Sequence, residues 1–125
     1  MNELSEQVIG AAIEVHREMG PGLLESTYER CLAHELSLRG IKGVRQKKQP
    51  ISYKGLNLDE GYRLDILVEG KIILELKVVD QLTDVHKAQL ITYLKLSGCT
   101  IGYLMNFNVV KFTDGLQRVV YNHPE

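Results

Sequence analysis

Tryptophan is absent from this sequence of 125 residues, and cysteine, phenylalanine and proline are scarce, with two, two and three copies. The two cysteines, Cys31 and Cys99, are too far apart in sequence for a CxxC metal or redox motif. We therefore expect them to be small buried hydrophobes in a reducing compartment, which points to the cytoplasm.

Long apolar stretches are also lacking. No run approaches the roughly 18 apolar residues of a transmembrane helix, and the opening MNELSEQVIG lacks the positive start and apolar block of a secretory signal. The sequence therefore predicts a protein that does not have a membrane as a partner.

Charge of one sign is not in excess either, since 15 Lys and Arg residues face 16 Asp and Glu residues, for a net charge of −1. Any contact with nucleic acid must then come from a local patch. The basic stretch KGVRQKK predicts such a patch along a phosphate backbone. Its cations are Lys42, Arg45, Lys47 and Lys48. The alternative is a charged edge strand that resists aggregation.

Hydrophobic periodicity predicts three helices and several strands. The helices are expected at 3–19, 23–39 and 84–97, antiparallel strands near 44–48, 50–58, 61–69 and 71–79, a buried strand at 100–107 and an edge strand at 116–122. The order α-α-β-β-β-β-α-β-β favours an α/β (α+β) fold with helices packed on one sheet. The length suits a single domain over residues 1–125.

Three charged residues interrupt the apolar runs of two neighbouring strands: Asp65, Glu75 and Lys77. Because side chains alternate along a strand, Glu75 and Lys77 share one face. A plain two-residue turn at 69–70 would put Asp65 on the other face. A three-residue loop, a five-residue loop or a bulge at Gly70 would bring Asp65 opposite Glu75, and we predict one of these.

Two interpretations of these charges are open. They could be solvent-facing groups on a half-exposed hairpin, with Glu75 and Lys77 forming an ion pair worth under about 1 kcal/mol. They could instead form a metal site, because two carboxylates about 4–6 Å apart raise each other's pKa unless a cation lies between them. Mg²⁺ or Mn²⁺ would suit such oxygen ligands, and Lys77 could hold a water beside the ion.

Asp65 followed by Glu75-Leu76-Lys77 resembles the D…(D/E)-x-K signature of the PD-(D/E)XK nuclease superfamily. The segment GLLESTY, with Glu25 and Tyr28, matches the GxxExxY motif that names a small family within it. The resemblance covers about residues 4–120, although Leu64 stands where a proline often precedes the first acid.

The helical segment HKAQLITYLKL also matches that family, with His86, Gln89 and Tyr93. The resemblance implies a restriction-endonuclease-like core, with a central mixed sheet flanked by helices. It implies that Gln89 positions a water or the substrate phosphate. His86, Tyr93 and Tyr28 would be auxiliary residues of the site.

The resemblance also assigns the metal ligands, Mg²⁺ or Mn²⁺ being the cofactor. Asp65 and Glu75 would bind the ion directly, and the backbone carbonyl of Leu76 would complete the site. Glu25 would be a further ligand, direct or through water, and Lys77 would orient the attacking water. With Gln89, these four charged residues form the expected catalytic set.

Each of the helical residues also has a structural interpretation that requires no catalytic role. Gln89 could be a satisfied amide at the core border, and the helix dipole favours an acid such as Glu25 in a first turn whatever its function. Tyr28 is expected to pack rather than react, and a lone histidine such as His86 is common on a helix surface.

The sequence as a whole predicts metal-dependent hydrolysis of a phosphodiester, with DNA preferred over RNA. A small domain would bind DNA weakly, which favours a homodimer or a protein partner. The alternative is a non-catalytic module that keeps the nuclease fold and binds nucleic acid or protein. A deep enclosed pocket would instead favour a hydrolase of small phosphorylated molecules.

Overall fold

The structure is a computed structural model and describes residues 2–124. Its elements are α1 (Asn2–Met19), α2 (Glu25–Leu38), β1 (Gly43–Lys48), β2 (Ile51–Tyr53), β3 (Leu56–Leu58), β4 (Arg63–Val68), β5 (Ile72–Lys77), α3 (Asp84–Ser97), β6 (Ile101–Asn106), the 3₁₀ turn η1 (Phe112–Gly115) and β7 (Leu116–Val120). The expected order is confirmed, with segment 50–58 folded as a hairpin of two short strands. Its turn residues Lys54 and Gly55 have φ values of 47° and 89°, the left-handed geometry that tight hairpins need.

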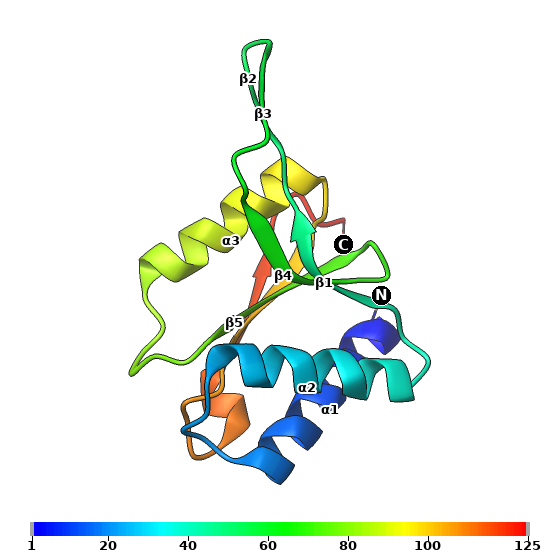
Figure 1. Cartoon of the computed structure of the whole chain (residues 1–125), viewed down its shortest axis with the longest axis vertical. Helices are drawn as coiled ribbons and strands as arrows, with labels where there is room; N and C mark the ends of the chain where they lie inside the picture. The colour runs from blue at the N-terminus through cyan, green and yellow to red at the C-terminus, as the bar shows by residue number, and fades with distance from the viewer. Residues whose placement is uncertain (1, 125) are drawn as a thin grey trace.

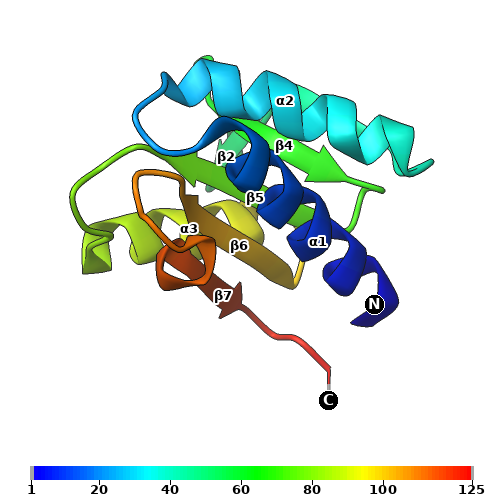
Figure 2. The ribbon, with the colours of Figure 1, turned by 90° about the horizontal axis from the view of Figure 1, so that it is seen from below.

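Five strands form a mixed sheet in the order β1-β4-β5-β6-β7. Within residues 2–124, β5 and β6 are the one parallel pair, and α3 is the crossover between them. In Figure 1 and Figure 2, α1 and α2 lie on one face of the sheet and α3 lies on the other. The expected central mixed sheet flanked by helices is therefore confirmed.

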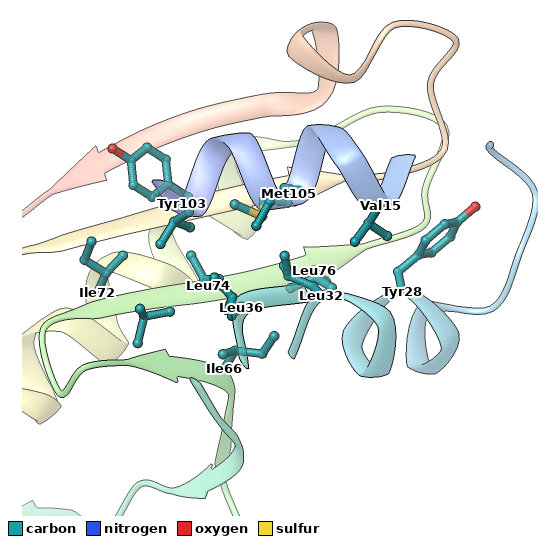
Figure 3. Packing of buried hydrophobic residues seen from close by; sticks show 14 of the residues in the cluster. Val15, Tyr28, Leu32, Leu36, Ile66, Ile72, Leu74, Leu76, Tyr103 and Met105 are labelled. Carbon is teal, nitrogen blue, oxygen red and sulfur yellow. The ribbon is translucent and has the colours of Figure 1, made fainter. Parts of the chain in front are cut away.

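The larger core lies between the sheet and the α1/α2 layer, as Figure 3 shows. On β5, the even residues Ile72, Leu74 and Leu76 face this core and are fully buried. Leu32 and Leu36 of α2 pack against them. Each such side chain contributes roughly 1.5–3 kcal/mol through burial.

The smaller core lies under α3. Gly102 on β6 permits a close approach, because a Cβ there would lie 2.9 Å from Leu90 Cδ1 and 3.1 Å from the Ile73 carbonyl oxygen. Thr83 is the N-cap of α3, and its side chain accepts a hydrogen bond from the His86 N–H. Gly98, with φ 80°, is the C-cap. Because of the close packing at Gly102, α3 covers the face of β5 that carries the odd-numbered residues.

The β4–β5 connection is a three-residue loop, because Val68 pairs with Ile72 and Ile66 with Leu74. Glu69 and Gly70 both have positive φ, 52° and 67°. This register confirms one of the three connections that the alternation argument required. The next facing position along the strands belongs to Asp65 and Glu75.

Cys31 and Cys99 are both free and half-buried. Among residues 2–124, none of the helices has the length and apolar character that crossing a bilayer requires.

Candidate metal centre

The candidate site lies where β4 and β5 stop pairing. Beyond the Ile66–Leu74 pair, side chains take over the inter-strand hydrogen bonds. The Asp65 N–H donates to Glu75 Oε2 at 3.0 Å, and the Leu76 N–H donates to Asp65 Oδ2 at 2.8 Å. Each carboxylate is thus held through one of its two oxygens, and the second oxygen can serve a further ligand.

The backbone carbonyl of Leu76 points into the same opening. In a strand, the N–H and C=O of one residue point to the same side, and those of the next residue point to the other. The Leu76 N–H is directed at Asp65, whereas the Lys77 carbonyl accepts from Phe107 N–H on the β6 side at 3.0 Å. The Leu76 carbonyl therefore lies on the β4 side with the two carboxylates.

Burial makes two charges costly here. Desolvation raises the pKa of Glu75 to about 8, with repulsion from Asp65 as the next cause. Desolvation also raises the pKa of Asp65 to about 6, assisted by the charges of Glu25 and Glu29 and opposed by the Leu76 N–H and Lys77. Near neutral pH the pair therefore does not carry two full negative charges without a compensating cation.

Lys77 supplies a positive charge beside these carboxylates and lowers the pKa of Asp65, Glu75 and Glu25. Its Nζ lies 3.5 Å from Gln89 Oε1, so a residue of α3 contacts the strand lysine directly. The ammonium therefore lies between the carboxylates and the amide of α3.

Glu25 is the first residue of α2, on an exposed turn. Partial desolvation raises its pKa, and Glu29 adds to this effect. Its place is determined by Tyr28, whose hydroxyl donates to the Gly20 carbonyl and accepts from the Leu23 N–H. Tyr28 is fully buried and stacks on Phe107 with ring centroids 4.6 Å apart.

Tyr93 and His86 lie on α3 with Gln89. Tyr93 is buried, and desolvation together with the charges of Glu75 and Asp65 raises its pKa. Its ring is therefore on the carboxylate side of the helix. His86 instead closes the start of α3, where its Nδ1 accepts a hydrogen bond from the Thr83 N–H at 3.0 Å.

One of the four expected nucleic-acid contacts, Arg45, lies apart from the other three. Arg45 Nε lies 3.2 Å from Glu29 Oε1 on the α2 side, and Lys48 Nζ lies 3.6 Å from Asp59 Oδ2. Lys42 and Lys47 line one hollow on the other side of β1, and Lys47 and Lys48 line a second one. Three of the four basic residues are thus near one another, and their contact with a phosphate backbone stays a prediction.

Sequence reasoning missed Glu29 and the clamp at Asn106. Glu29 is buried, and both its oxygens accept from Gln46 Nε2 at 3.0 Å. The only signal was its i+4 spacing from Glu25. Asn106 Oδ1 accepts from the Val79 N–H at 3.1 Å, and its Nδ2 donates to the Val79 carbonyl at 2.9 Å, which holds the chain just beyond Lys77.

The donor set suits an ion that keeps much of its own water. Within the part of the chain that is described, no three His, Cys, Asp or Glu side chains cluster closely enough to hold a metal. Asp65, Glu75 and the Leu76 carbonyl remain as neighbouring oxygen donors, with Glu25 farther out. Mg²⁺ commonly binds through one or two carboxylates and retains several waters, so these residues fit it.

A comparison with protein families matches residues 2–119 to the model of the PD-(D/E)XK nuclease superfamily. The chain belongs to the PD-(D/E)XK nuclease superfamily. Members of this superfamily are generally nucleases and typically use divalent metals. A search of curated proteins and a search of solved structures each gave no significant match.

Proposed function

We propose that this protein is a metal-dependent nuclease of the GxxExxY type that hydrolyses phosphodiester bonds in the cytoplasm. The observation that carries the proposal is the facing pair of half-buried Asp65 and buried Glu75, which have raised pKa values and Lys77 beside them. A structural ion pair would need only one of the two acids. The preference for DNA over RNA rests on the superfamily, whose members mainly cut DNA.

Asp65, Glu75 and the Leu76 carbonyl would hold Mg²⁺ or Mn²⁺, with Glu25 as a ligand through water. When bound, the ion lowers the pKa of a water and neutralises charge on the phosphate. The remaining chemistry belongs to the chain itself. The Lys77 ammonium donates to the attacking water or to a non-bridging phosphate oxygen, and Gln89 Oε1 limits where that ammonium can lie.

Cleavage of a labelled DNA duplex with Mg²⁺ or Mn²⁺ tests the proposal. Lys77→Ala should lower the rate at least about 100-fold, the typical cost of losing one group that stabilises the transition state. Lys71→Ala in the β4–β5 loop is the matched control, because this exposed lysine lies at the far end of the same strand.

Equal cleavage by wild type and Lys77→Ala would point to a contaminating nuclease and end the proposal. If wild type binds the duplex without cutting it and shows no metal-dependent thermal shift, the protein is the non-catalytic module instead.

A further inference from the structure

The hairpin of β2 and β3 stands apart from the rest of the fold and is called the arm here (residues 51–58). It projects beyond the end of the sheet where β1 ends and β4 begins (Figure 1). The two strands form a separate sheet and pair only with each other. A lone two-stranded hairpin is marginally stable in water, so the arm gains most from a partner.

The arm has one apolar face. Ile51 pairs with Leu58 and Tyr53 with Leu56, and alternation places these four side chains together. Tyr53 is 62% exposed and Leu56 is 55% exposed. The opposite face carries Ser52 paired with Asn57. The arm is therefore an amphipathic ribbon whose apolar side is open.

The tip of the arm carries a lysine, and the base carries charges of both signs, with Lys47 and Lys48 at the end of β1. Lys54 occupies the tip, and its Nζ lies 5.3 Å from the centroid of the Tyr53 ring. Asp59 and Glu60 follow β3 at the base. Asp59 already pairs with Lys48, whereas Glu60 forms no ion pair within residues 2–124.

We propose that the apolar face of the arm docks onto the arm of a second copy of this chain, antiparallel about a two-fold axis. In this arrangement the tip of each arm lies beside the base of the other. The two-fold axis then gives two equivalent ion pairs between Lys54 of one copy and Glu60 of the other. A two-fold contact requires a surface that complements itself. Lys54 at the tip, Glu60 at the base, which is unpaired within residues 2–124, and the apolar stripe between them meet that requirement.

Nucleic acid is a poorer occupant of the same face. Isoleucine and leucine, which supply three of its four side chains, offer no hydrogen-bonding groups to base edges or phosphates. The inference does not depend on catalysis, so the dimer and the proposed nuclease can fail independently.

Sedimentation equilibrium of the full chain over a wide concentration range is the test. Wild type should move reversibly from monomer to dimer. Tyr53→Ser with Leu56→Ser should weaken dimerisation at least about tenfold, because both side chains would leave the centre of the contact. Ser52→Ala with Asn57→Ala, on the other face of the same strands, should leave it unchanged. Thermal unfolding of each variant checks the fold.

A charge exchange tests the orientation. Lys54→Glu alone and Glu60→Lys alone should each weaken the dimer severalfold, because like charges then face each other. The double variant K54E/E60K should return it to near the wild-type value. A wild type that is monomeric throughout overturns the proposal. A double variant that dimerises no more tightly than the single variants also overturns it. A third contrary result is a monomeric wild type that binds a DNA duplex through the arm, so that the Tyr53→Ser, Leu56→Ser variant loses this binding.

Discussion

The two faces of β5 differ although their residues alternate along six positions of one strand. Ile72, Leu74 and Leu76 meet α1 and α2 in the larger core. Ile73, Glu75 and Lys77 point toward α3, a single helix that covers only part of its face. The apolar face therefore stabilises the folded state, whereas the other face destabilises it in part, because two carboxylates are held there with little contact with water.

Glu75→Gln should give the largest effect on the polar face. Cleavage should fall at least about 1000-fold, since the charge of a proposed metal ligand is lost. The free energy of unfolding at pH 8 without metal should rise, because a buried charge is removed. Cleavage of the labelled duplex and a denaturant series measure the two effects. A destabilised variant that still cuts DNA would contradict the division between the faces.

Leu74→Ala, one residue away, should have the opposite pattern of effects: a loss of stability with little change in cleavage. Removing a fully buried leucine side chain costs roughly 2–5 kcal/mol of unfolding free energy. The rate of cleavage per folded molecule should change little, because the side chain points away from the carboxylates. Urea unfolding and cleavage at a temperature well below the transition provide the comparison. An exposed substitution, Val85→Ala on α3, is the control for unfolding.

Stability of the metal-free protein should depend on pH through the two acids. Their pKa values are about 6 for Asp65 and about 8 for Glu75, above the ordinary 3.8 and 4.5. The folded state binds more protons than the unfolded chain between these limits, so unfolding free energy should fall as pH rises from about 4 to about 8. One pKa unit corresponds to about 1.4 kcal/mol.

Metal should reverse this trend, because bound ligands must be deprotonated. Excess Mg²⁺ should therefore raise the melting temperature more at pH 8 than at pH 5. The double variant D65N/E75Q should show a flatter pH profile and no response to Mg²⁺. An equally steep profile in that variant would assign the dependence to other groups.

Much of the site follows from alternation alone. If Asp65 and Glu75 are to face each other, the connection between their strands must have a suitable length, and the three-residue loop at 69–71 has it. The local sequence was enough to predict this pairing because both strands are short and regular. It was not enough for the hairpin turn, since Lys54-Gly55 lacks the Asn or Asp that usually marks such a turn.

Long-range contacts were the other limit. Glu29 is buried because Arg45 and Gln46 contact its carboxylate. Both residues belong to β1, the strand that follows α2. Gln46 adopts φ 54° in the middle of β1, which no propensity indicates. The separation of Arg45 from the other basic residues has the same origin, because Arg45 turns toward α2 to pair with that buried acid.

Gln89→Ala should give the smallest effect on the polar face. The contact between Lys77 Nζ and Gln89 Oε1 is 3.5 Å long, at the weak end of hydrogen bonding, and Gln89 is exposed. The variant leaves the ammonium in place with more freedom, so we expect cleavage to fall about tenfold, much less than for loss of a ligand. Lys87→Ala, also exposed on α3, is the matched control. An effect as large as that of Lys77→Ala would mean that the amide contacts the substrate itself, and α3 would then share the chemistry of the strand face rather than only restrain it.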